Sequence, residues 1–275
     1  IPQGSLLHYK GFLKPLNAAG FVPAKADPCL FVHKDQDMAI TLHVDDGVLA
    51  APSLADAELI LGKQGLGAVR TLTWGTLKST LGIEFTVKYT PTSRSVFMCQ
   101  RAYASTILER ANMVDANPVL TPAIPGRKYT KRDCPADDAA VQALARRGMS
   151  QKTYHTVVAS TNFLVAITRD DMRFVQGKLA KYCANPGAEH FLALRHQLKF
   201  LKGTLDYGIE FKWSSSDPPP PDGPLTLESW SDSSYADDVD TGKTTMGGLV
   251  KANGATVSAY SKLSKRVDSC VNHSE

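Results

Sequence analysis

The apolar and polar positions alternate most clearly in an early part of the chain, where three short apolar runs are separated by polar turns. These runs are Cys29–His33, Met38–Val44 and Gly47–Ala50. Apolar runs of this length, bounded by turn residues, are typical of antiparallel β-strands. We therefore expect a small sheet whose inner turn carries Asp45 and Asp46.

Elsewhere the apolar residues recur at helical spacing or in further short runs. The sequence predicts helices at 5–20, 54–63, 101–111, 154–167, 172–183 and 189–201. It predicts strands at 81–87, 96–98, 207–211, 225–230, 246–251 and 256–260. Asn253-Gly254 is a strong hairpin-turn signal between the last two strands. The expected fold class is α+β, with antiparallel sheets and helices.

Two segments interrupt this pattern. Residues 123–150 are rich in Pro, Arg, Lys, Asp and Ala and show little apolar periodicity, which favours a linker. Residues 214–224 contain a serine run and four consecutive prolines, which is typical of a spacer with polyproline character. We therefore expect boundaries at both places.

The composition narrows the class of protein. The chain has 275 residues, of which 43% are hydrophobic, and no apolar run approaches the roughly 20 residues that span a bilayer. The five cysteines are scattered without a Cys-x-x-Cys pair, which favours reduced thiols inside the cell. A net charge of +4 permits binding to a polyanion without requiring it.

The adjacent carboxylates of Asp45 and Asp46 have two interpretations. Neighbouring like charges repel, and a divalent cation held between them relieves that repulsion. Asp and Gly are also favoured turn formers, so Asp45-Asp46-Gly47 can equally be a plain turn. On this stretch alone both interpretations stay open. Asp232 ends the first strand of the last group, and an isolated Asp at a strand end is most often a cap or turn residue.

Several motifs follow one another in a fixed order. They are Asp27-Pro28-Cys29-Leu30-Phe31, His43-Val44-Asp45-Asp46, Leu81-Gly82-Ile83-Glu84, Gln100-Arg101-Ala102-Tyr103, Thr121-Pro122, Ser231-Asp232, Tyr235-Ala236-Asp237, Tyr260-Ser261-Lys262 and Ser274-Glu275. In this order they resemble the copia-type LTR retrotransposon Pol polyprotein, from the second half of its reverse transcriptase into its RNase H. The acidic motif departs from the family pattern, because His43 stands where the family usually has Tyr.

The resemblance implies a division of the chain. Residues 1–122 would be a partial reverse-transcriptase palm and the start of the thumb, followed by a linker at 123–150. Residues 151–213 would be a helical thumb or connection, residues 214–224 a Pro-rich spacer, and residues 225–275 the N-terminal part of an RNase H-like domain. The chain is then expected to be a piece of a longer polyprotein.

The resemblance also implies a chemistry, namely two-metal nucleotidyl transfer with Mg²⁺ or Mn²⁺. Asp45 and Asp46 would be polymerase metal ligands, and Asp232 and Glu275 would be nuclease metal ligands. The remaining acids of both sites are expected on segments before Ile1 and after Glu275. The fragment would therefore be a reverse transcriptase and RNase H piece that is inactive alone.

The family's partners are an RNA/DNA primer-template and deoxynucleoside triphosphates, besides the remainder of the Pol polyprotein. The residues expected to contact nucleic acid are His43, Lys178, Lys181, Arg195, Lys199 and Lys202, although a hydrogen-bonded structural His43 and a merely solvated basic helix face are the alternatives. The expected location is cytoplasmic or nuclear, in a virus-like particle for an intact element, and not in a membrane. The alternative hypothesis is that the chain is a non-catalytic retroelement remnant that at most binds nucleic acid or protein.

Overall fold

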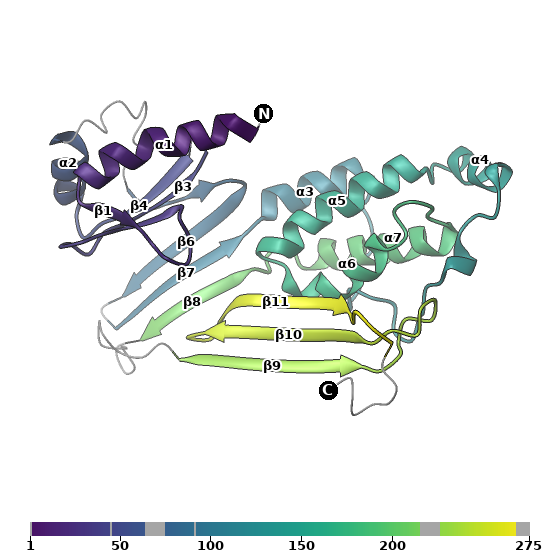
Figure 1. The fold of residues 1–275 in the computed structure, drawn as a ribbon. Helices are drawn as coiled ribbons and strands as arrows, with labels where there is room; N and C mark the ends of the chain where they lie inside the picture. The colour runs from purple at the N-terminus through teal and green to yellow at the C-terminus, as the bar shows by residue number, and fades with distance from the viewer. Residues whose placement is uncertain (1, 45, 64–74, 91, 215–225, 268–275) are drawn as a thin grey trace. The chain divides into compact units, whose positions relative to one another are not determined.

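The computed structural model describes residues 2–44, 46–63, 75–90, 92–214 and 226–267. The chain forms two compact units, Ile1–Thr76 and Leu77–Glu275. Each unit combines helices with antiparallel sheets (Figure 1), which confirms the predicted α+β class. No helix in the described part of the chain is both long and apolar enough to cross a bilayer.

The first unit is a four-stranded antiparallel meander with two helices. Its elements are α1 (Pro2–Ala18), β1 (Phe21–Pro23), β2 (Leu30–His33), β3 (Ala39–His43), β4 (Asp46–Ala50) and α2 (Leu54–Lys63). Its small core holds Leu16, Ala19, Phe21, Phe31, Met38 and Ile40. Gly20 has a φ of 93°, a left-handed conformation that suits glycine and ends α1. The predicted helices and strands of this region are confirmed.

The second unit begins with a four-stranded sheet that the sequence only partly predicts. Its strands are β5 (Ser79–Thr80), β6 (Ile83–Thr90), β7 (Ser93–Cys99) and β8 (Ile209–Ser214), in that order. β8 comes after every helix of the described residues, yet it pairs with β7, with Met98 opposite Ile209. Gly208 permits this approach, because a Cβ there would lie 2.1 Å from the carbonyl oxygen of Met98.

Helices α3 (Arg101–Arg110), α5 (Gln151–Ile167), α6 (Arg173–Ala180) and α7 (Ala188–Gly203) share one hydrophobic core. Tyr154 is fully buried in this core, and its hydroxyl donates to the carbonyl of Leu179 at 3.0 Å. The 3-10 helix η3 (Asp170–Met172) leads directly into α6. The three predicted helices after residue 150 are confirmed, although the second is shorter than expected.

The segment predicted as a linker contains regular structure. The 3-10 helix η2 (Lys131–Asp133) is followed by α4 (Asp138–Arg146). The Asp137 side chain accepts the N–H of Ala140 at 2.8 Å and so caps α4. None of the residues of α4 is buried, so this helix adds nothing to the core.

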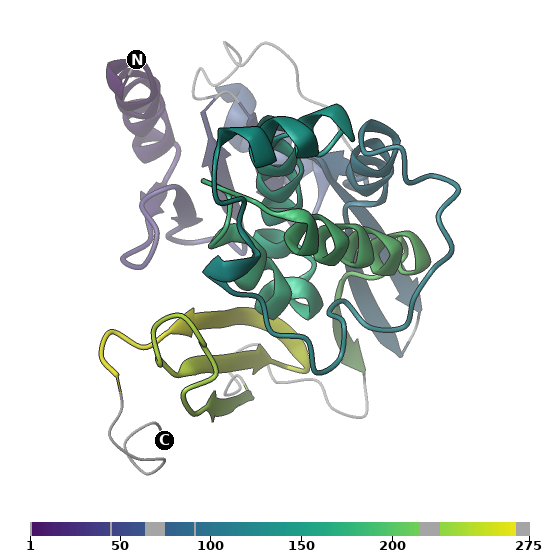
Figure 2. The ribbon, with the colours of Figure 1, turned by 90° about the vertical axis from the view of Figure 1, so that its right-hand side faces the viewer.

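The last sheet has three antiparallel strands in the order β11-β10-β9. Its strands are β9 (Leu227–Ser234), β10 (Thr245–Ala252) and β11 (Ala255–Leu263). The predicted hairpin turn is confirmed, because Asn253 and Gly254 have φ values of 47° and 80°. Figures 1 and 2 show this sheet, coloured green to yellow, lying along one side of the helices, where β11 packs against α6.

Candidate functional site

The acidic hairpin predicted from the sequence is present, and its turn is two residues long. β3 and β4 pair antiparallel, and the last pair joins His43 to Asp46, so the turn lies between these two residues and begins with Val44. The side chains of His43 and Asp46 are exposed, and Asp45 lies outside the described residues. The hairpin is therefore confirmed, whereas the roles of these three residues stay predictions.

Val44 adopts an unusual backbone conformation at this turn. Its φ is 53°, in the left-handed region that costs an L-residue with a Cβ about 1–2 kcal/mol. Two-residue hairpin turns favour this conformation because its twist matches that of the strands, and Asn or Gly is the usual residue there. A β-branched valine is therefore strained. Strain of this kind clusters at functional sites.

Asp232 lies on the first strand of the last sheet. It pairs with Gly247 of β10, and its Oδ1 accepts the N–H of Ser233 at 2.9 Å. The sequence predicted that Asp232 lies at the end of this strand, and its position on the strand is confirmed, although β9 continues two residues further, to Ser234, as an exposed edge strand. Glu275, the expected second nuclease ligand, lies outside the described residues.

A metal centre is not assembled within the part of the chain that the structure describes. Those residues contain no group of three or more His, Cys, Asp or Glu side chains that could hold a metal ion. One member of each predicted ligand pair, Asp45 or Glu275, lies outside that part. The Mg²⁺ or Mn²⁺ sites therefore stay predictions.

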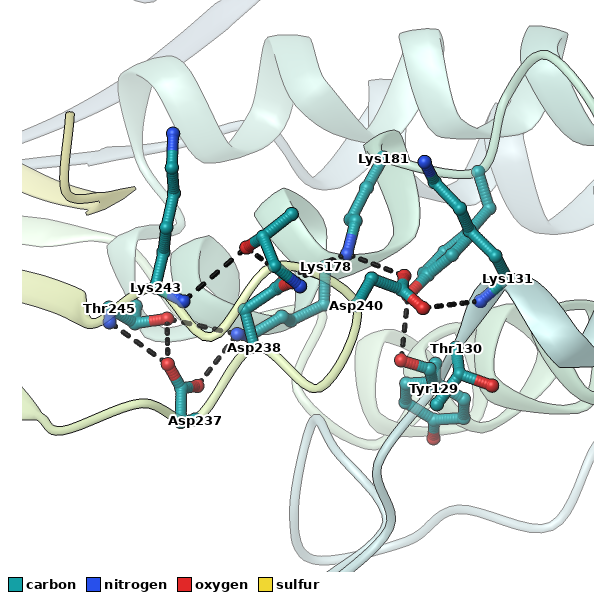
Figure 3. Close-up of polar contacts among 12 residues, drawn as sticks. Tyr129, Thr130, Lys131, Lys178, Lys181, Asp237, Asp238, Asp240, Lys243 and Thr245 are labelled. Atoms are coloured by element: carbon teal, nitrogen blue, oxygen red, sulfur yellow. Dashed lines mark hydrogen bonds and ion pairs between the residues drawn. The ribbon is translucent and has the colours of Figure 1, made fainter. Parts of the chain in front are cut away.

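An extensive polar arrangement among the described residues of the second unit was not predicted from the sequence. Two lysines of the α6 region reach into the loop that joins β9 to β10 (Figure 3). The Nζ of Lys178 lies 2.7 Å from Asp237 Oδ2 and donates to Thr245 Oγ1 at 2.9 Å. We use the name lysine clamp for Lys178 and Lys181 together with the four residues whose side chains they contact, which are Asp237, Asp238, Asp240 and Thr245.

Lys181 completes the lysine clamp by lying between two further carboxylates. Its Nζ is 2.7 Å from Asp238 Oδ2 and 2.7 Å from Asp240 Oδ2. The two aspartate side chains are only 3% and 8% exposed, and that of Lys181 is 20% exposed. These charges are therefore largely removed from water and compensate one another.

The close contact between Lys181 and its carboxylate partners shifts the pKa of both kinds of group. Burial alone would raise the pKa of Asp238, but hydrogen bonds from Lys181 and Thr241 outweigh it and hold this pKa below its ordinary 3.8. Burial would likewise lower the pKa of Lys181, but its hydrogen bonds to Asp238 and Asp240 raise it above 10.5. Both groups are therefore ionised across the physiological range.

A third segment of the chain joins the lysine clamp through Asp240. The backbone N–H of Lys131 donates to Asp240 Oδ1 at 2.8 Å. The hydroxyl of Tyr182 lies 2.6 Å from the carbonyl oxygen of Tyr129 and 3.1 Å from Asp240 Oδ2. Figure 3 shows these groups converging from three parts of the sequence. Each oxygen of Asp240 is occupied, which suits a structural role better than a reactive one.

The remaining predicted nucleic-acid contacts lie on α7. Arg195, Lys199 and Lys202 recur at helical spacing, so they share one face of the helix. Arg195 is exposed and is one of the residues that line a largely apolar cavity of about 340 Å³ between α5 and α7. Lys199 and Lys202 are half-buried. Their contact with nucleic acid stays a prediction.

Comparison with known proteins assigns the family. Over 272 residues, which are 97% of this chain, the sequence is 27% identical to the retrovirus-related Pol polyprotein from transposon TNT 1-94 of Nicotiana tabacum. It is 31% identical over 192 residues to the corresponding polyprotein from transposon RE1 of Arabidopsis thaliana. The chain belongs to the copia-type retrotransposon Pol family. It spans 19% of the length of the tobacco Pol polyprotein and 11% of the Arabidopsis one.

Part of this Pol-family sequence is also similar to a much smaller protein. Over 119 residues the chain is 32% identical to the secreted RxLR effector protein 161 of Plasmopara viticola. The aligned segment is 43% of this chain and 78% of that protein. No protein-family model matches the chain. No solved structure matches it either.

Proposed function

We propose that this chain is a segment of a retrotransposon RNA-directed DNA polymerase with a linked RNase H. The observation that carries the proposal is the β3–β4 hairpin, whose strained two-residue turn lies beside Asp46 in a chain of the Pol family. Residues 1–122 would supply part of the palm and the start of the thumb. Residues 225–275 would supply the first strands of the nuclease.

The proposed chemistry is phosphoryl transfer assisted by two divalent ions, Mg²⁺ or Mn²⁺. Such ions, when bound, bring the attacking and leaving oxygens into line and stabilise the charge that develops at phosphorus. Asp45 and Asp46 would hold them in the polymerase, and Asp232 and Glu275 in the nuclease. Carboxylate oxygens are suitable ligands for both ions.

We expect this segment to need other parts of the polyprotein for activity. By resemblance it supplies two polymerase carboxylates, and the third belongs to an earlier strand of the palm. The isolated chain should therefore show no template-directed incorporation on a primed RNA with Mg²⁺ or Mn²⁺. Robust incorporation by the isolated chain that Asp45→Asn abolishes would contradict this expectation.

A chimera tests the proposal directly. The matching segment of an active copia-type Pol polyprotein is replaced by this chain, and primer extension and RNA cleavage in an RNA/DNA hybrid are measured. Asp46→Asn should lower extension at least about 100-fold, because even outer-shell partners of a metal cost about 10–100-fold. Asp232→Asn should lower hybrid cleavage to a similar extent.

Matched variants control for nonspecific loss of charge. Asp37→Asn removes a carboxylate from the loop before β3, away from the acidic turn, and should leave extension unchanged. Glu228→Gln removes a carboxylate from β9 that is exposed like that of Asp232, and it should leave hybrid cleavage unchanged. A chimera that extends primers equally well with and without Asp46 would overturn the polymerase assignment.

The second candidate function is a non-catalytic remnant that binds nucleic acid or protein. The similarity to a small effector protein favours it, because there a stretch of related sequence makes up most of a separate protein. Arg195, Lys199 and Lys202 on α7 would then be the candidate contacts. A chimera that folds but neither extends primers nor cleaves hybrids would support this function over the first.

A further inference from the structure

The sheet formed by β9, β10 and β11 buries few hydrophobic side chains. Among its described residues only two hydrophobic side chains are buried, those of Ala252 and Ala255. Nearly every residue of β9 is exposed. A small sheet normally needs a hydrophobic face packed on a partner element to be stable. The contacts that determine where this sheet lies against the helices are therefore largely polar.

The polar contacts concentrate at one end of this sheet. The buried polar side chains of residues 226–267 are Asp238, Thr244, Thr245 and Ser264. Two of them belong to the lysine clamp, as the acceptors of Lys181 and Lys178. The clamp therefore connects α6 to the sheet where the loop enters β10.

The lysine clamp is connected to the strand that carries Asp232. Asp237 Oδ1 accepts both the N–H and the hydroxyl of Thr245, at 2.9 and 2.6 Å. Thr245 is paired with Ser234 at the end of β9, and Gly247, two residues further, is paired with Asp232. The clamp thus lies about 7 Å along the ladder from Asp232, at about 3.3 Å per residue.

We propose that Lys178 and Lys181 are positioning residues that fix the β9–β10 loop on α6 and thereby hold the strand that presents Asp232. The catalytic consequence of this positioning rests on the proposed nuclease role of Asp232, whereas the positioning itself does not. It gives the two lysines an internal role in place of the nucleic-acid contact expected from the sequence. Buried ion pairs add little net stability, but removing one partner leaves an uncompensated buried charge. The β9–β10 loop is then no longer held in place on α6.

Amide hydrogen exchange in the full chain tests the positioning. Lys181→Met leaves Asp238 and Asp240 facing each other without a cation, and we expect the amides of β9 and β10 to exchange at least tenfold faster. Lys178→Met should act in the same direction. The amides of α5 and α7 should change less than twofold, because their core contains neither lysine.

Two further variants make the result specific. Lys243→Met removes a lysine of the same loop whose ammonium points away from the three aspartates in Figure 3, and it should leave exchange unchanged. Lys181→Arg keeps the charge and should restore protection. Unchanged exchange in Lys181→Met would overturn the proposal. Equal acceleration in α5 and α7 would also overturn it, because the lysine would then support the whole unit instead of the strands.

The chimeric polyprotein tests the catalytic consequence. Lys181→Met should lower hybrid cleavage at least tenfold more than primer extension, with recovery in Lys181→Arg and no effect of Lys243→Met. Equal losses of both activities would overturn the specific link to Asp232. If Asp232→Asn leaves cleavage intact, the proposed nuclease role fails, whereas the exchange experiment still decides the positioning role by itself.

Discussion

The buried surroundings of His190 determine its pKa. It is fully buried and stacks on Tyr182, with ring centroids 3.9 Å apart. Its Nδ1 accepts the N–H of Gly187 at 2.9 Å, which requires that nitrogen to be unprotonated. Burial lowers the pKa of His190 below its ordinary 6.5 and outweighs the nearby carboxylate of Asp133. The ring is therefore neutral in the folded protein.

This environment predicts a loss of stability in mild acid. As the pH falls below about 6.5, the unfolded chain binds a proton at this histidine before the folded chain does, so the free energy of unfolding falls. The slope approaches about 1.4 kcal/mol per pH unit until the lower folded pKa is reached. His190→Asn keeps an acceptor for the N–H of Gly187 and cannot take up the proton.

Denaturant titrations between about pH 7 and pH 5 check this expectation. The His190→Asn protein should show a shallower dependence on pH than the parent. His155→Asn, a change at an exposed position of α5, should keep the parental slope. Identical slopes for the parent and His190→Asn would rule out a contribution from this histidine.

At the scale of single elements, the sequence predicted those whose signals are local. Helix α2 has the bounds that the sequence predicted, Leu54–Lys63, and the Asn253-Gly254 turn lies where its dipeptide indicated. The strand ending at Asp232 was placed too short because exposed Ser and Asp residues do not look like a strand, although their backbone still pairs. Helix α4 was missed because the Pro, Arg, Lys and Asp content of the segment around it favoured a linker.

The β3–β4 hairpin gives a prediction at this scale. Val44→Asn replaces a strained β-branched residue by one that tolerates the left-handed conformation, so the first unit should gain about 1 kcal/mol of unfolding free energy. Val32→Asn, at another exposed valine of the same sheet, should instead lose stability because Asn has low β-propensity. Chemical denaturation measures both.

The turn prediction also has a functional readout in the chimeric polyprotein. If the strain at Val44 serves to present the acidic pair, Val44→Asn should lower primer extension while it raises stability. A stability loss in Val44→Asn comparable to that in Val32→Asn would show that the turn is not strained.

At the scale of the whole molecule, the chain divides into two units with separate cores. Among the described residues, the main core cluster of the second unit runs from Tyr103 to Leu205, so none of its members precedes Leu77. The first unit has six buried hydrophobic residues in its main cluster. Small cores of this kind are marginal in isolation. The second unit is therefore the more autonomous of the two.

Residues 77–275 expressed alone should fold. We expect one cooperative thermal transition, with a midpoint within about 3 °C of the main transition of the full chain, which corresponds to about 1 kcal/mol for this size. Residues 1–76 alone should show a broad or absent transition. Far-ultraviolet circular dichroism measures both, and a non-cooperative melt of 77–275 would contradict the independence of its core.

The sequence by itself determined the family, the fold class and most helices and strands, because periodicity and turn residues act over a few neighbouring positions. It also predicted the acidic hairpin, whose two strands are adjacent along the chain. Only the tertiary structure decided that β8 pairs with β7 and that Lys181 lies between Asp238 and Asp240. These contacts join distant segments, and no local pattern specifies which carboxylate a helical lysine will meet. An exposed basic residue and a buried, paired one look alike until the chain is folded.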